Sequence, residues 1–178
     1  MTPEELKSLI RTVPDFPKPG IQFRDITTLI GHGQGLAATV DHLAQRAKQR
    51  GAQAIAGMEA RGFIFGAAVA VQLGIPFLLV RKPGKLPVET IGVEYELEYG
   101  TDRLEIDPTS VAAGQRVVIV DDLIATGGTA EAAIKLLRKA DGVVEDALFV
   151  IDLPDLGGAT RLQSANVSVA SLFDFEGD

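Results

Sequence analysis

The chain has 178 residues, and 24 acidic against 17 basic residues give it a formal net charge of −7. A hydrophobic content of 46% excludes a disordered chain and fits one globular domain over residues 1–178. The absence of cysteine excludes disulfides and thiolate metal sites, and a pI of about 4.9 argues against a nucleic-acid partner.

The N-terminal third predicts a short helix, an extended arm and a long helix, in that order. Thr2-Pro3-Glu4-Glu5 has the pattern of a capping box that opens a helix. Several prolines in Val13–Ile21 predict an extended arm. Apolar residues then recur at helical spacing over Gln34–Arg50, which predicts the clearest helix of the chain. We see no signal peptide before these elements and no apolar run near the ~20 residues that cross a bilayer, so we expect a cytoplasmic protein without a membrane partner.

From residue 52 onward, short apolar strands alternate with helices. The predicted strands are Ala52–Met58, Pro76–Lys82, Arg116–Asp121, Val143–Leu153 and Val167–Phe173, and the predicted helices between them are Phe63–Leu73 and Thr129–Lys139. This alternation predicts an α/β fold with a Rossmann-like, doubly wound parallel sheet. Ligands of such sheets collect at the carboxyl ends of the strands.

Two segments depart from this alternation of strands and helices. Pro83–Ile106 carries charges, prolines, glycines and two alternating stretches, which predict a hairpin or a mobile flap over residues 83–106. The acidic end of the chain, Asp174–Asp178, is expected to be solvated.

The most informative stretch is Val117–Thr129. A buried strand ends there in two carboxylates, Asp121 and Asp122, and small, hydroxylated and glycine residues follow at once and open onto a helix. Converging backbone amides, a helix N-terminus and threonine hydroxyls form a cradle for an anion. The two carboxylates can accept hydrogen bonds from a diol or hold a hydrated divalent cation.

Val117–Thr129 resembles the motif that binds 5-phosphoribosyl diphosphate (PRPP) in type I phosphoribosyltransferases. Further runs resemble the adenine-specific members of that family: Asp15–Ile21, Phe23–Ile26, Glu59–Phe63, Arg81–Pro87 and Leu97–Gly100. The resemblance implies that adenine and PRPP react to AMP and pyrophosphate with Mg²⁺, as a step of purine salvage. It also implies a homodimer, for which Arg61–Leu73 is a plausible interface, a small N-terminal hood that binds the base (residues 1–33), and a catalytic flap.

The resemblance assigns the phosphate and ribose contacts as follows. The 5′-phosphate would be held by Ala125, Thr126, Gly127, Gly128 and Thr129, and the ribose hydroxyls by Asp121 and Asp122. Pyrophosphate would be bound by Arg61, Lys82 and Lys85. Mg²⁺ would be bound mainly through PRPP.

The base and the flap receive further assignments from the resemblance. Phe23 would stack on the purine, main-chain groups of Gln22–Arg24 would read its edge, and Leu123 would cover its other face. Glu98 is the candidate general acid or base, and Tyr99 beside it would help the flap to close.

Two alternatives stay open. A 6-oxopurine phosphoribosyltransferase would need a lysine near the exocyclic oxygen of the base and an aromatic residue late in the chain. Phe173 and Phe175 are late aromatic residues, but no lysine follows Lys139. A PRPP-sensing purine regulator would need a DNA- or RNA-binding element, which the acidic pI and the acidic first helix do not favour.

Overall fold

The computed structural model describes residues 1–97 and 99–177. Its centre is a parallel sheet of five strands in the order β4-β3-β7-β8-β9. The strands are β3 (Ala54–Met58), β4 (Phe77–Val80), β7 (Arg116–Ile124), β8 (Val143–Asp152) and β9 (Ser168–Asp174). The predicted parallel α/β sheet is therefore confirmed.

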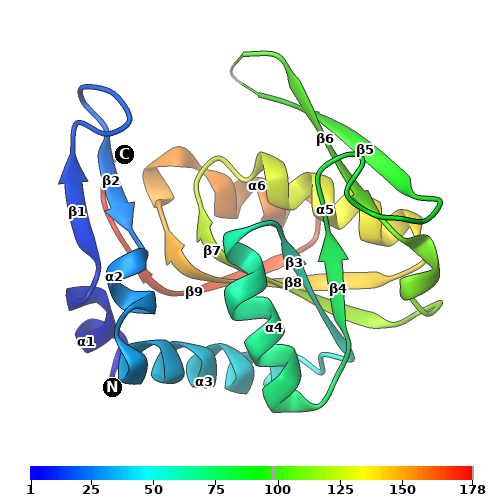
Figure 1. Ribbon diagram of the computed structural model, residues 1–178, viewed down its shortest axis with the longest axis horizontal. Coiled ribbons are helices and arrows are strands. Elements are labelled where there is room, and N and C mark those ends of the chain that lie inside the picture. Colours follow the sequence, from blue (N-terminus) through cyan, green and yellow to red (C-terminus); the bar gives the residue numbers. More distant parts are fainter. Residues whose placement is uncertain (98, 178) are drawn as a thin grey trace.

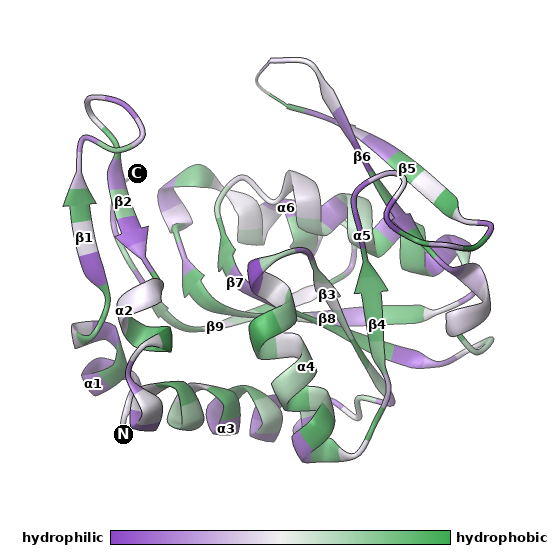
Figure 2. Ribbon diagram, in the orientation of Figure 1, coloured by the Kyte–Doolittle hydropathy of each residue, from purple (hydrophilic) through white to green (hydrophobic). Residues whose placement is uncertain are grey.

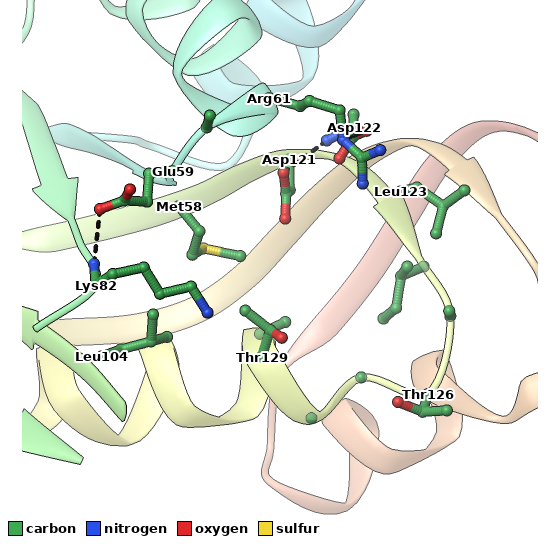
Figure 3. Close-up of a pocket in the computed structure, with 16 residues that line it drawn as sticks. Met58, Glu59, Arg61, Lys82, Leu104, Asp121, Asp122, Leu123, Thr126 and Thr129 are labelled. Atoms are coloured by element: carbon green, nitrogen blue, oxygen red, sulfur yellow. Dashed lines mark hydrogen bonds and ion pairs between the residues drawn. The ribbon is translucent and has the colours of Figure 1, made fainter. Parts of the chain in front are cut away.

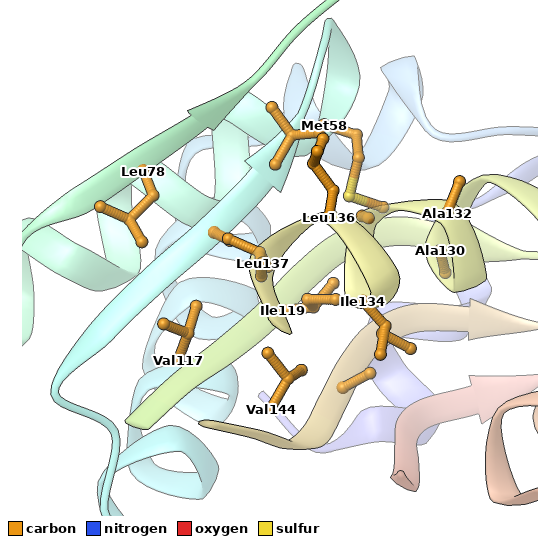
Figure 4. Packing of buried hydrophobic residues seen from close by; sticks show 14 of the residues in the cluster. Met58, Leu78, Val117, Ile119, Ala130, Ala132, Ile134, Leu136, Leu137 and Val144 are labelled. Atoms are coloured by element: carbon orange, nitrogen blue, oxygen red, sulfur yellow. The ribbon is translucent and has the colours of Figure 1, made fainter. Parts of the chain in front are cut away.

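Helices cover both faces of this sheet (Figure 1). Because neighbouring side chains of a strand point to opposite faces, Val117 and Ile119 of β7 pack toward α5 (Gly128–Lys139), as Figure 4 shows. Val118 and Val120 pack into the cluster formed with α3 (Gly33–Gln49) and α4 (Arg61–Leu73). In Figure 2, β4 and most of α4 are coloured as hydrophobic. Burial on both faces explains why the central strands are continuous apolar runs.

Residues 1–33, the predicted hood, contain α1 (Pro3–Ser8), β1 (Arg11–Pro14), β2 (Gln22–Asp25) and α2 (Thr27–Ile30). The predicted capping box is confirmed, because the Thr2 hydroxyl accepts from the Glu5 amide at 3.2 Å. The prediction of a plain extended arm was wrong in part. β1 and β2 pair antiparallel, with Val13 opposite Phe23, so the segment is a hairpin whose prolines lie mainly in its loop.

Asp25 holds the hood hairpin to the helix that follows it. Its carboxylate accepts from the Thr27 hydroxyl and amide at 2.6 and 2.9 Å and pairs with Arg11. These contacts lower the pKa of Asp25 to about 2. Asp25 therefore stays ionised above that pH and fixes the end of β2.

Residues 83–106 contain a second hairpin, formed by β5 (Ile91–Glu96) and β6 (Thr101–Ile106). Its inner side chains Ile91, Val93 and Tyr95 pack against the cluster that contains α5. The backbones of Arg81 and Glu105 pair as an isolated antiparallel β-bridge, which joins β6 to the residue that follows β4. The alternating pattern thus marks paired strands, and the mobility of the segment stays a prediction.

Several boundaries differ from the predicted ones. β7 continues through both carboxylates to Ile124, α4 begins at Arg61, and α6 (Gly158–Ser164) with two short 3-10 helices, Pro108–Ser110 and Pro154–Leu156, was not predicted. The expectation that Asp174–Asp178 is solvated was wrong for Phe175, whose ring is half-buried between side chains of the hood. Asp178 lies outside the described residues. No helix in the described part of the chain has both the length and the apolar character to span a membrane.

Candidate active site

Two adjoining cavities lie at the carboxyl ends of the central strands. The larger, of about 480 Å³, is bounded by the ends of β3 and β7 and by the loop that leads into α5. The smaller, of about 290 Å³, lies between β2 and the ends of β7 and β8. Arg61, Asp122 and Leu123 line both cavities. The wall between the two spaces is therefore built from the end of β7 and the start of α4.

Asp121 and Asp122 stand at this wall, as Figure 3 shows. The Asp122 amide donates to Asp121 Oδ1 at 2.9 Å, and Arg61 Nε lies 2.8 Å from Asp122 Oδ2. Burial raises the pKa of Asp121 well above its ordinary value, and the neighbouring Asp122 carboxylate raises it further. A methyl group on Gly62 would lie 2.7 Å from Asp121 Oδ1. The glycine after Arg61 therefore gives the carboxylate room to approach α4.

The loop Ala125–Thr129 forms the far side of the larger cavity. Gly127 has φ +84°, a left-handed conformation that glycine adopts without strain. No side chain caps the first turn of α5 in the described structure. Its first amides are consequently available to an anion, and Thr126 and Thr129 line the same cavity.

The loop is supported from behind by the start of α6. The Gly158 amide donates to the Ala125 carbonyl at 3.0 Å. A methyl group on Gly158 would lie 2.5 Å from that same carbonyl oxygen. The course of the loop is thus fixed by a close approach of two backbone segments.

Of the two predicted flap lysines, only Lys82 lines the larger cavity. Burial opposes its charge, but hydrogen bonds to Asp102 and to the Tyr95 hydroxyl, the latter at 3.2 Å, outweigh this effect and raise the pKa of Lys82. Its backbone amide donates to Glu59 Oε1 at 2.7 Å. Lys85 is exposed and lines neither cavity.

The smaller cavity brings together the residues predicted to bind a base. Gln22, Phe23 and Arg24 line one side of it, and Leu123 lines another. Phe23 contacts Phe16 edge to face, with ring centroids 5.1 Å apart. The Arg24 guanidinium bonds to the Thr12 hydroxyl at 2.7 Å and to the Glu176 carbonyl at 3.0 Å.

Like Lys85, Tyr99 is not brought into either cavity: its side chain is 85% exposed. Glu98, also predicted to act here, lies outside the described residues. Conversely, no role was predicted for Glu59, Ile151 or Leu153, which line the cavities. Their position at or next to the carboxyl ends of β3 and β8 was the signal that could have found them.

The donor set near the wall is poor in metal ligands. Within residues 1–97 and 99–177, no group of three or more His, Asp or Glu side chains is close enough to hold a metal ion alone. Asp121 and Asp122 can supply carboxylate oxygens. This set suits Mg²⁺, which binds through one or two carboxylates together with phosphate oxygens.

The chain is similar along most of its length to known proteins of one family. The family model of the phosphoribosyl transferase domain matches residues 27–154. An adenine phosphoribosyltransferase of Erythrobacter litoralis is 72% identical over 177 residues, 99% of each chain. The crystal structure of an adenine phosphoribosyltransferase from Thermoanaerobacter pseudethanolicus is 49% identical, with a TM-score of 0.92 over 98% of this chain and 100% of that chain. A Saccharomyces cerevisiae enzyme of the same name, complexed with an imino-altritol bisphosphate and adenine, is 37% identical, with a TM-score of 0.90 over 96% and 97% of the two chains.

Proposed function

The chain belongs to the phosphoribosyl transferase family, as an adenine-specific member that converts adenine and PRPP to AMP and pyrophosphate. We propose that its larger cavity holds PRPP and its smaller cavity holds adenine. The observation that carries this division is the common wall of Arg61, Asp122 and Leu123. It lets the anomeric carbon of PRPP face the base across a short gap.

The reaction is a pentosyl transfer, a displacement at the anomeric carbon in which positive charge grows on the ribose ring as pyrophosphate leaves. The protein's task is to position the two reactants and to stabilise the charges. Asp121 and Asp122 would accept hydrogen bonds from the ribose hydroxyls and favour the cationic ring. The 5′-phosphate would lie against the amides of Ala125–Thr129.

Pyrophosphate would be bound by Arg61, at the wall, and by Lys82 and Lys85. Lys82 is paired with Asp102 and Tyr95, so it must exchange these partners for the pyrophosphate, and Lys85 must move inward with the segment that carries it. Closure of the hairpin β5–β6 over the cavity, with Tyr99 at its tip, is the motion that would bring this about.

Mg²⁺ is the cofactor that this chemistry implies. Asp121 and Asp122 are the carboxylates that would contact the ion or its water ligands, while PRPP supplies most of the coordination. When bound, Mg²⁺ neutralises the charge on the leaving pyrophosphate.

Adenine would stack on Phe23, with main-chain groups of Gln22–Arg24 at its edge and Leu123 on its other face. Phe23→Ala removes the stacking surface and is expected to raise KM for adenine about 10-fold or more, since stacking of a base on an aromatic ring is worth ~1–3 kcal/mol. KM for PRPP should stay near the wild-type value. Steady-state kinetics with each substrate varied in turn checks this, and an unchanged KM for adenine would leave Phe23 as a packing residue.

Glu98 stays our candidate for proton transfer to or from the base. Glu98→Gln keeps the size of the side chain and removes its acid–base function, so kcat is expected to fall by about 10²-fold while PRPP binding, measured by calorimetry, is retained. Turnover at the wild-type rate would remove Glu98 from this role.

The function itself is tested with purified protein, Mg²⁺, PRPP and each of adenine, hypoxanthine, guanine and xanthine. AMP and pyrophosphate should form when the base is adenine, and none of the other three bases should react. Turnover of a 6-oxopurine would keep the PRPP cavity but contradict the base assignment. Binding of PRPP without turnover of any base would instead indicate a sensor.

We also propose a homodimer, because α4 exposes apolar side chains, among them Val71 with 81% and Ile64 with 41% of their surface accessible. Light scattering of the purified protein would test the mass. The cytoplasmic location stays a prediction.

A further inference from the structure

The C-terminal segment after β9 crosses to the hood and places an aromatic ring there. Phe175 follows the last strand directly, and its ring lies 6.1 Å from that of Phe173, edge to face. Two cations of the hood lie over the same ring: Lys7 Nζ of α1 at 4.7 Å and Arg24 Cζ of β2 at 4.5 Å from its centroid. Such contacts are attractive because the face of an aromatic ring is electronegative.

Arg24 connects this ring to the strand that lines the base cavity. Its guanidinium donates to the Thr12 hydroxyl of β1 at 2.7 Å and to the Glu176 carbonyl at 3.0 Å. One side chain of β2 is thereby tied both to the other hood strand and to the C-terminal segment. Figure 1 shows the segment that leaves β9 running up beside β2.

The same segment is also attached to the opposite side of the base cavity. The Phe175 amide donates to the Asp152 carbonyl at 3.0 Å, and the Gly177 amide donates to Asp155 Oδ2 at 2.8 Å. Asp155 belongs to the short helix Pro154–Leu156, and Leu156 of this helix lines the smaller cavity, as Phe23 of β2 does. The segment 175–177 therefore contacts two elements that line this cavity, β2 and the short helix Pro154–Leu156, while Phe175 itself lines neither cavity.

We propose that Phe175 is a positioning residue that holds β2 at its distance from the far wall of the base cavity, through Lys7 and Arg24 over its ring. This inference rests on the proposal that the smaller cavity binds adenine. The larger cavity is built from other elements, so loss of the ring changes the binding of the base and leaves the binding of PRPP intact.

Phe175→Leu tests this, because it keeps an apolar side chain and removes the aromatic face. We expect KM for adenine to rise about 10-fold, as for the loss of two cation–π contacts, with kcat at saturating substrate and KM for PRPP within about twofold of wild type. Phe175→Tyr keeps the aromatic face and should restore the adenine KM. If Phe175 had a merely structural role, Phe175→Leu would raise the KM values for adenine and PRPP alike, or would lower the yield of folded protein.

Two further variants keep the outcome decisive. If Phe175→Leu does not fold, Lys7→Met removes one cation at the surface and should still raise KM for adenine two- to threefold. Phe23→Ala, measured alongside, separates the two proposals. An effect of Phe23→Ala without any effect of Phe175→Leu or Lys7→Met would overturn the positioning role only. No effect of any of the three on KM for adenine would overturn the base site as well.

Discussion

Asp121→Asn is expected to make the free protein more stable and at the same time to disable it. Burial and the adjacent Asp122 carboxylate raise the pKa of Asp121, so holding its charge at neutral pH costs folding free energy. In the wild-type protein the Asp122 amide donates to Asp121 Oδ1 at 2.9 Å. An asparagine at position 121 removes the charge, and its side-chain oxygen can still accept this hydrogen bond. The same charge stabilises the cationic ribose in our proposal, and its loss should lower kcat/KM for PRPP about 100-fold.

The pH dependence of stability gives this prediction its sign. An acid with a raised pKa in the folded state destabilises that state as pH rises from the unfolded value, 3.8, through the folded one. The asparagine variant should therefore melt at a higher temperature than wild type at pH 8 and lose this advantage near pH 4. For a domain of this size, 1 kcal/mol corresponds to about 2–4 °C in Tm.

A matched control for Asp121→Asn is Asp41→Asn. Asp41 is exposed on α3 and accepts only from the side-chain amides of Gln45, at Oδ2, and Gln72, at Oδ1, among the described residues. An asparagine keeps one of these bonds through its oxygen, and its NH2 group can donate to the other glutamine once that amide has turned over. Neither Tm nor kcat/KM should change there. Calorimetry across pH, with steady-state kinetics, checks both variants, and an Asp121→Asn protein that melts lower at pH 8 and stays active would refute the assignment.

The part of the fold that the sequence predicts best is the part decided by local pattern. Val117–Val120, the middle of the predicted strand Arg116–Asp121, are apolar because both faces of the strand are buried. The glycines that follow indicate a tight turn before a helix. The extension of β7 to Ile124 was missed, because two adjacent carboxylates in a strand contradict its propensity. Partners outside the strand, chiefly Arg61 at 2.8 Å, compensate for them.

The features that could not be predicted depend on residues far apart in the chain. The pairing of Val13 with Phe23 sets the hood hairpin, and a proline-rich loop gives no sign of its register. Lys82 meets Asp102 only because β5 and β6 fold back over α5. Phe175 sits in an acidic stretch whose composition indicates solvation, yet two cations from the other end of the chain decide its position.

Gly158→Ala is expected to weaken PRPP binding, although Gly158 does not line the cavity that we assign to PRPP. The added methyl group would lie 2.5 Å from the Ala125 carbonyl oxygen and 2.6 Å from Ile124 Cγ1. The first of these atoms is backbone, so relief requires the peptide at Ala125 to move, and the hydrogen bond from the Gly158 amide at 3.0 Å is lost with it. Overpacking of this kind costs about 1–3 kcal/mol.

The displaced peptide begins the loop that we assign to the 5′-phosphate, so the cost appears in function as well as in stability. We expect KM for PRPP to rise at least about 10-fold and the affinity for AMP, measured by calorimetry, to fall in parallel, because both carry the 5′-phosphate. KM for adenine should change less, since Phe23 and Leu156 lie on the other cavity. Gly33→Ala is the control, because a methyl group there meets nothing within 4 Å and φ is not left-handed. A shift of the first peptide of the loop Ala125–Thr129 must weaken the binding of a phosphate that the amides of this loop hold. If Gly158→Ala lowered Tm but left AMP affinity and KM for PRPP at wild-type values, this loop would not be the phosphate site.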